Sequence, residues 1–142
     1  MSEHVVPIRP RYGEVDSMGV VYHAWYLLYF DVGRTEWMRA AGLPYADLER
    51  RGYRLAVVDA GLRYLRGARY DEDLRLHTRV SEVGGATVTF TYELRGPAGL
   101  LATGHTRLGC LDTSNRPVRL PLDARAALAG GIPPVARPSE VA

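Results

Sequence analysis

The chain is poor in cysteine and has no lysine. Its one cysteine, Cys110, excludes an intrachain disulfide and leaves too few thiols for a zinc cluster. Because Cys110 lies in an alternating apolar run, we expect a buried and unreactive thiol. All 18 basic residues are arginine. Arginine forms bidentate contacts to phosphate and carboxylate better than lysine does, although a coding bias or adaptation to heat would give the same composition.

Long hydrophobic runs and a strong net charge are also lacking. No stretch approaches the roughly 20 apolar residues that span a bilayer, and the first residues do not join a basic segment to an apolar one. We therefore expect no membrane insertion and a cytoplasmic location. The net charge of +2 is too small to indicate a nucleic-acid partner. No glycine-rich phosphate loop and no metal-ligand spacing is present.

The 142 residues are enough for one domain with a substantial core. The apolar fraction of 46% and the charged fraction of 24% are ordinary for a globular protein. We place the domain at residues 1–131 and predict that the proline-rich segment 132–142 is a disordered tail.

One long helix is predicted, over residues 22–41. Apolar residues recur at helical spacing and cover most of its circumference, so we expect it to be buried on several sides. Gly42 and Pro44 end it. The shorter elements near it are an edge strand over 4–11, a loop over 12–21, a helical turn over 46–51 and a closing helix over 122–128.

From residue 53 onward the hydrophobic period is two, which predicts strands. These strands lie within 53–65, 74–80, 88–94 and 100–108, with hairpin turns at 84–85 and 96–99. The result is an α+β fold in which an antiparallel sheet of about five strands curves around the long helix. Open sheet edges invite pairing with another copy, so we expect a homodimer and, beyond it, a dimer of dimers.

The most distinctive segment is RYGEVDSMGVVYHAWYLLYFDVGRTE, residues 11–36. Asp16 lies in a turn-rich loop, and Tyr22-His23 stands at the start of the predicted helix. This arrangement suits attack on a carbonyl. The carboxylate acts on a proton or as nucleophile, and the free N–H groups of the first helical turn hold the developing oxyanion.

This segment resembles the hotdog-fold acyl-CoA thioesterases of the 4-hydroxybenzoyl-CoA thioesterase type, in particular the branch associated with the bacterial Tol-Pal cluster. The matching positions are Asp16, Gly19, Val20, Val21, Tyr22, His23, Tyr26, Asp31, Gly33, Arg34 and Glu36. The stretch 67–80 also resembles the family's lead into its third strand, and the whole resemblance covers about residues 5–120. It implies one hotdog thioesterase domain with no cofactor, in which coenzyme A enters as part of the substrate.

Three positions depart from the family pattern. Met18 is bulkier than the small residue often found there, and we expect it to reshape the acyl pocket. Gly33 lowers helix propensity by up to ~1 kcal/mol relative to alanine. Asp31 replaces the more usual glutamate. None of the three removes the expected catalytic carboxylate.

By this resemblance Asp16 is the catalytic carboxylate, which either attacks the thioester or activates water. A thioester needs no metal, because its thiolate departs readily, but it does need a base or nucleophile and a stabilised oxyanion. The competing interpretation is that Asp16 only caps the following helix or a turn. Asp16 stands several residues before the predicted helix, which weakens the helix-capping account.

The residues around Asp16 have two interpretations each. The His23 N–H is expected to face the substrate carbonyl and its imidazole to hold the carbonyl or orient water, or else His23 is a partly buried residue satisfied by the backbone. Gly19 permits close approach to the substrate as well as a tight turn. Tyr22 and Tyr26 line the pocket or the core, or else act chemically; Tyr22 is counted with Asp16, His23 and Gly19 among the candidate catalytic residues, and Tyr26 among the substrate-binding ones.

Arginines are the candidates for the phosphates of coenzyme A. We single out Arg63, Arg66 and Arg69, for each of which a solvated surface position is the alternative. On the long helix we interpret Arg34 and Glu36 as a structural polar pair, and not Glu36 as a catalytic carboxylate. His77 and His105 fall on the polar phase of their strands, so we expect them to be solvated or in an interface.

The sequence therefore predicts an enzyme that hydrolyses an acyl-CoA to a free acid and coenzyme A. Two alternatives stay open. One is a non-catalytic hotdog module that binds or senses acyl-CoA. The other is a hotdog dehydratase or hydratase of acyl thioesters, although the His and carboxylate motif typical of those enzymes is not found in this sequence.

Overall fold

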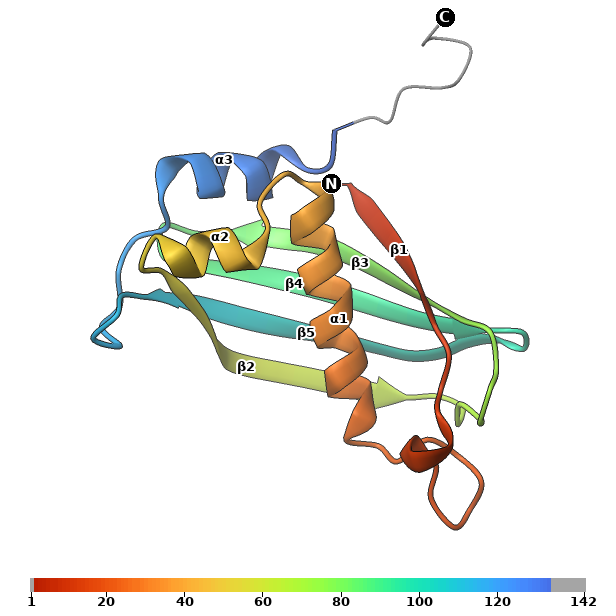
Figure 1. Ribbon diagram of the computed structural model, residues 1–142. Helices are drawn as coiled ribbons and strands as arrows, with labels where there is room; N and C mark the ends of the chain where they lie inside the picture. The colour runs from red at the N-terminus through yellow and green to blue at the C-terminus, as the bar shows by residue number, and fades with distance from the viewer. Residues whose placement is uncertain (1, 134–142) are drawn as a thin grey trace, which may run out of the picture.

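The computed structural model describes residues 2–133. Residues 134–142 of the predicted tail lie outside the described residues. Figure 1 shows one antiparallel sheet with a long helix lying across it. The strands are β1 (Glu3–Ile8), β2 (Arg54–Tyr64), β3 (Leu74–Val83), β4 (Thr87–Gly96) and β5 (Gly99–Leu111). The helices are the 3₁₀ turn η1 (Tyr12–Glu14) and α1 (Trp25–Ala40), α2 (Tyr45–Arg50) and α3 (Leu122–Gly130). None of the described helices is long and apolar enough to cross a membrane.

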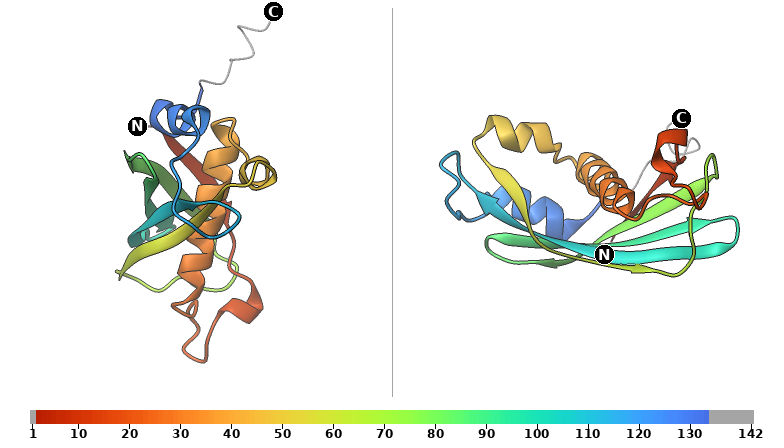
Figure 2. Two further views of the ribbon diagram at one scale, coloured as in Figure 1. Left: turned by 90° about the vertical axis from the view of Figure 1, so that its left-hand side faces the viewer. Right: turned by 90° about the horizontal axis from the view of Figure 1, so that it is seen from below.

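The sheet has five strands in the order β1-β3-β4-β5-β2, so β1 and β2 are its edges. The predicted α+β hotdog architecture is thus confirmed. The apolar residues that alternate along the strands in the sequence are the ones buried in the structure. Along β4, Val88, Phe90, Tyr92 and Leu94 are buried, and the residues between them are only partly buried. Figure 2 shows that the sheet is curved and that α1 lies within the curve.

The long helix begins three residues later than predicted. Residues 22–24 form a turn that leads into α1, in which the Trp25 N–H donates to the Tyr22 carbonyl at 2.9 Å. The Tyr22 N–H donates to the Glu14 carbonyl at 2.8 Å and thereby ties this turn to the preceding loop. Tyr22 therefore belongs to the end of the loop, and α1 begins at Trp25.

Glycines allow α1 to approach the sheet closely. A Cβ atom on Gly33 would lie 2.5 Å from Thr78 Oγ1 and 2.6 Å from Leu76 Cδ2, far inside van der Waals contact. On β5, a Cβ on Gly104 would lie 2.4 Å from Phe30, whose ring stacks on Tyr92 with 4.3 Å between centroids. The low helix propensity of Gly33 is therefore offset by the packing that its missing side chain permits.

One side of α1 is left uncovered. The helix packs chiefly against β1 and β3, and its residues Leu27, Leu28 and Val32 remain exposed, as do Val57 and Val58 on the edge strand β2. The expectation that the helix is buried on several sides is wrong for this side, because the sheet of one chain reaches only part of the way around it.

We expect Gly33→Ala to lower the free energy of unfolding by about 1–3 kcal/mol, because the added methyl group forces α1 away from β3. Urea denaturation followed by far-UV circular dichroism measures this. Gly130→Ala is the matched control, since a Cβ at Gly130 meets nothing within 4 Å. A Gly33→Ala variant as stable as wild type would show that the helix does not need this close approach.

Candidate active site

Asp16 begins a tight turn at the tip of a hairpin-like loop between η1 and α1. A bridge between Val15 and Val21 closes the loop. Inside it, the Asp16 N–H donates to the Val20 carbonyl at 2.9 Å, and the Gly19 N–H donates to the Asp16 carbonyl at 3.0 Å. Gly19 has φ of +80°, a conformation that glycine adopts without steric cost. Gly19 therefore forms the tight turn that was predicted for it.

The Asp16 carboxylate is held through one of its oxygens. Oδ1 accepts a hydrogen bond from the Met18 N–H at 2.8 Å, a local side-chain turn typical of aspartate. Within residues 2–133 no partner binds Oδ2. The side chain is partly buried, and it makes no cap on α1, whose N-terminus has no side-chain cap. The helix-capping interpretation is wrong, whereas the turn leaves one carboxylate oxygen available for chemistry.

The mouth of α1 presents backbone donors. The Tyr22 carbonyl accepts from Trp25, and the His23 carbonyl accepts from the Tyr26 N–H at 3.3 Å. Among the described residues no acceptor is found for the N–H groups of His23 and Ala24, and both residues are exposed. Such free donors carry the positive end of the helix dipole and suit an anion.

Aromatic rings surround this helix mouth. The rings of Tyr22 and His23 lie 4.4 Å apart, and the Tyr64 ring meets those of His23 and Tyr26 edge-on at 6.3 and 5.1 Å. Tyr22 is exposed. Tyr26 is buried, and its hydroxyl accepts a hydrogen bond from the Ala68 N–H at 3.1 Å. Tyr26 therefore belongs to the core as well as to the wall of the site.

A buried carboxylate anchors the loop to the helix. Glu14 is 4% exposed and accepts hydrogen bonds from the Arg11 N–H at 3.0 Å, from Arg11 Nε at 2.7 Å and from the Tyr29 hydroxyl at 2.7 Å. Burial by itself would raise the pKa of Glu14, but these hydrogen bonds together hold the pKa below its ordinary value. The carboxylate therefore stays ionised and keeps η1 attached to α1.

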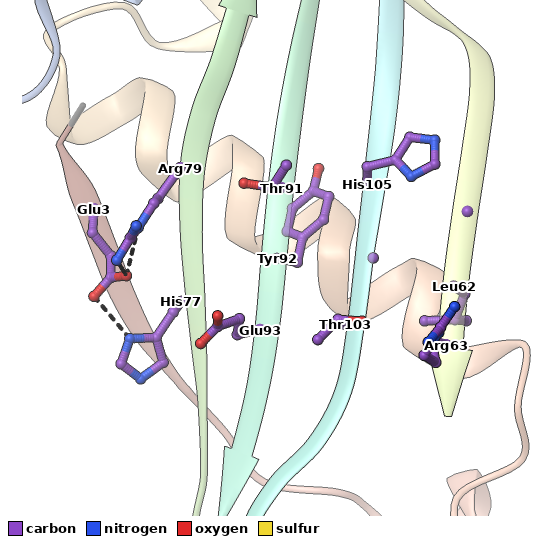
Figure 3. A pocket seen from close by; sticks show the side chains of 12 residues that line it. Glu3, Leu62, Arg63, His77, Arg79, Thr91, Tyr92, Glu93, Thr103 and His105 are labelled. Carbon is purple, nitrogen blue, oxygen red and sulfur yellow. Dashed lines mark hydrogen bonds and ion pairs between the residues drawn. The ribbon is translucent and has the colours of Figure 1, made fainter. Parts of the chain in front are cut away.

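The three candidate arginines lie in different places. Arg69 is beside the loop, because it forms a bridge with Val20. Arg66 follows β2 and donates to the Ala98 carbonyl at 3.0 Å. Arg63 lies on the sheet face turned away from α1, and Figure 3 shows it there with the helix behind the sheet. The structure thus does not bring Arg63 to Asp16.

That outer face carries a trough of about 520 Å³. Its charged and titratable lining residues are Glu3, Arg63, His77, Arg79, Glu93 and His105. His77 is hydrogen-bonded to Glu3 at 2.9 Å, as Figure 3 shows, and His105 to Asp59 at 2.9 Å. Both histidines occupy the polar face, as their strand phase predicts.

Three side chains of the site, Glu14, Tyr29 and Tyr64, were not predicted from the sequence, and one pair of side chains was predicted incorrectly. Glu14 stands only two residues before Asp16 in the motif, which was the available signal. Arg34 pairs with Asp31 at 2.5 Å, and Glu36 pairs with Arg39 at 3.2 Å. The predicted pairing of Arg34 with Glu36 is wrong, since residues two apart on a helix point in different directions.

The fold is a five-stranded sheet that curves around a central helix, and an acidic loop leads into that helix. This is a hotdog fold of the kind found in thioester hydrolases. The Thioesterase-like superfamily matches residues 10–128, and the chain belongs to that family. It is a thioester hydrolase. Its place in the Tol-Pal-associated branch stays a prediction.

Individual relatives match over most of the chain. The acyl-CoA thioesterase YbgC of Haemophilus influenzae is 34% identical over 123 residues, 85% of this chain and 90% of that protein. The DHNA-CoA thioesterase of Staphylococcus aureus has a TM-score of 0.88 at 31% identity, covering 92% of this chain and 91% of its own. A protein of unassigned function from Thermus thermophilus has a TM-score of 0.86 at 37% identity, covering 89% and 97%.

We expect Glu14→Gln to lower the free energy of unfolding by about 1–3 kcal/mol at pH 7, because the buried Tyr29 hydroxyl and the exposed Arg11 lose a charged acceptor. The lowered pKa means that the native state keeps this carboxylate ionised when the unfolded chain has taken up a proton. Its contribution is therefore complete above the unfolded-state pKa of about 4.3 and is lost as the pH falls through the lowered value.

Urea denaturation from pH 7 down to pH 3 checks this. The stability difference between wild type and Glu14→Gln should shrink toward the acid end. Glu82→Gln, at an exposed position of β3, should leave stability unchanged at pH 7. An equal loss for the two variants would contradict the anchoring role of Glu14.

Proposed function

We propose that the protein hydrolyses an acyl-CoA thioester to a carboxylic acid and coenzyme A, with Asp16 as the reacting carboxylate. The observation that carries this proposal is a partly buried carboxylate, fixed through one oxygen by Met18 and free at the other. The names of the relatives agree with it: YbgC of Haemophilus influenzae is an acyl-CoA thioesterase, and the Staphylococcus aureus neighbour acts on DHNA-CoA.

Two routes use the same carboxylate. As general base, Asp16 removes a proton from water while the water oxygen bonds to the thioester carbon. The tetrahedral oxyanion then collapses, the C–S bond breaks and the thiolate of coenzyme A leaves. As nucleophile, Asp16 bonds to the thioester carbon and expels the thiolate. Water then hydrolyses the resulting anhydride and restores the carboxylate.

The remaining candidate residues take supporting roles. The His23 N–H at the helix mouth donates to the oxyanion, where a preorganised donor is worth most. Gly19 keeps the turn tight beside the substrate, and Met18, 80% exposed at the loop tip, contacts the acyl group. Tyr22 and Tyr26 form the aromatic wall. For the coenzyme phosphates, Arg66 and Arg69 are better placed than Arg63.

We also infer that two copies form a homodimer through the uncovered side of α1 and the edge strand β2. Exposed apolar residues occur on these two elements and directly after β2: Leu27, Leu28, Val32, Val57, Val58, Tyr64 and Leu65. Exposed apolar side chains next to a strand edge that has no partner within residues 2–133 favour association with a second copy. Because Tyr64 adjoins His23, the same association would enclose the helix mouth. The dimer of dimers stays a prediction.

We expect Asp16→Asn to reduce thiol release by at least about 100-fold, because the amide can neither take up the proton nor attack. A panel of acyl-CoAs from acetyl to palmitoyl, with benzoyl types, measures release and names the acyl class. Asp112→Asn serves as control. Asp112 accepts hydrogen bonds from the Ser114 and Arg116 N–H groups in the loop that directly follows β5.

Three outcomes separate the candidate functions. Turnover of Asp16→Asn within a few-fold of wild type would remove Asp16 from the mechanism. Saturable acyl-CoA binding by wild type without thiol release would indicate the sensing module. Formation of an enoyl or hydroxyacyl thioester would indicate a dehydratase or hydratase.

Leu28→Lys should raise the dissociation constant of the dimer by at least about 30-fold, because a charge would be buried in the interface without a partner. Sedimentation velocity over a range of protein concentrations measures this. Leu122→Lys is the matched control, a leucine on α3 that is exposed outside the apolar surface. A wild-type chain that sediments as a monomer at every concentration would overturn the homodimer.

A further inference from the structure

We propose that Tyr64 is a positioning residue that orients the peptide between His23 and Ala24, so that the Ala24 N–H becomes a second oxyanion donor beside the His23 N–H. This inference rests on the proposed hydrolysis at Asp16. It concerns a tyrosine on a strand, outside the loop and helix that carry the family motif.

The contact that carries the inference joins the sheet to the helix mouth. Tyr64 is the last residue of β2, which ends beside the first turn of α1 in Figure 1. Its hydroxyl donates to the His23 carbonyl at 3.0 Å. The other bond to that carbonyl, from the Tyr26 N–H, is 3.3 Å long, beyond the usual range for a strong N–H···O bond. Tyr64 therefore supplies the better of the two restraints on this peptide.

The planar peptide between His23 and Ala24 links the orientation of the His23 carbonyl to that of the Ala24 N–H. In a planar trans peptide the C=O and the N–H point in opposite directions. A carbonyl of His23 that is held toward Tyr64 and Tyr26 therefore directs the Ala24 N–H to the opposite side. The peptide before it is arranged in the same way, because the Tyr22 carbonyl accepts from Trp25 at 2.9 Å. The two consecutive N–H groups, of His23 and Ala24, thus share one outward-facing end of the helix.

Among residues 2–133, Tyr64 is the only side chain that binds the His23 carbonyl. The N-cap position of α1 is Ala24, which has no side chain able to cap, and no other side chain caps the helix. The His23 and Ala24 N–H groups find no acceptor among residues 2–133. A helix end without a cap frays readily, so a hydrogen bond from the rigid sheet has a direct effect on how well these donors are aligned.

The Tyr64 side chain is itself held in place. Its ring packs edge-on against His23 and Tyr26. Partial burial, and then the neighbouring Tyr26, raise the pKa of the Tyr64 hydroxyl above its ordinary value. The hydroxyl therefore remains a protonated donor throughout the neutral pH range.

Tyr64→Phe removes the hydroxyl and keeps the ring contacts. We expect kcat for the best acyl-CoA substrate to fall about 5- to 30-fold, less than for complete removal of an oxyanion donor. KM should stay within about twofold, because the donors act on the transition state. Tyr45→Phe is the matched control. It removes a tyrosine hydroxyl that bonds to a backbone group of the same strand, the Leu55 N–H at 3.1 Å, at the other end of β2, and kcat should be unchanged.

A second variant removes the donor itself. Replacing Ala24 by lactic acid, its α-hydroxy analogue, converts the amide between residues 23 and 24 into an ester and deletes the N–H. A proline would not serve, because it would force His23 out of the turn in which the Tyr22 carbonyl accepts from Trp25. We expect a loss of about 100-fold in kcat. When Tyr64→Phe is combined with this ester, the Tyr64 change should cost less than about twofold further, because the group that Tyr64 orients is already absent.

The outcomes distinguish this inference from the proposed function. The expected result is a fall in kcat for Tyr64→Phe that disappears when the Ala24 N–H has been replaced by the ester oxygen. Additive losses, a rise in KM with kcat unchanged, or a Tyr64→Phe variant as active as Tyr45→Phe would overturn the role of Tyr64 and leave hydrolysis by Asp16 intact. Absence of thiol release from wild type with every acyl-CoA would overturn the proposed function and this inference together.

Discussion

The close packing of α1 on the sheet is the constraint on which the site depends. Gly33 and Gly104 remove the side chains that would separate the helix from β3 and β5, so the position of the helix on the sheet is determined by backbone and aromatic contacts. Its N-terminus is thereby brought to the end of β2, where Tyr64 meets the His23 carbonyl. A helix held farther from the sheet would not place the His23 carbonyl within reach of that tyrosine.

The acidic loop is then attached to this fixed helix by polar contacts. The buried Glu14 carboxylate joins η1 to Tyr29 of α1, and the Glu14 carbonyl holds the Tyr22 N–H. On the other side, Val20 forms a bridge with Arg69 and the Val21 N–H donates to the Ala68 carbonyl. The loop that carries Asp16 is thus restrained from both sides. This restraint lets a short segment outside the sheet present a carboxylate in one orientation.

Most of the fold could be predicted from the sequence, because period-two alternation and one long apolar helix are local signals. The strand order β1-β3-β4-β5-β2 and the exposed side of α1 depend on packing between distant segments, and no local pattern contains them. In the site, the position of Asp16 in a turn followed from nearby glycine and serine residues. The contacts of Glu14 with Tyr29 and of Tyr64 with His23 span 15 and 41 residues, and only the folded chain reveals them. Arg63 shows the same limit: its neighbour Tyr64 reaches the site, but adjacent residues of a strand point to opposite faces.

Strand β2 takes part in two different surfaces of the molecule. Along one edge its backbone is unpaired and apolar residues are exposed, whereas its last residue contacts the peptide at the mouth of α1. Any partner that pairs with this edge would also restrict the motion of Tyr64. Assembly and chemistry would then be linked through a single strand, and the alignment of the backbone donors would change with the degree of association.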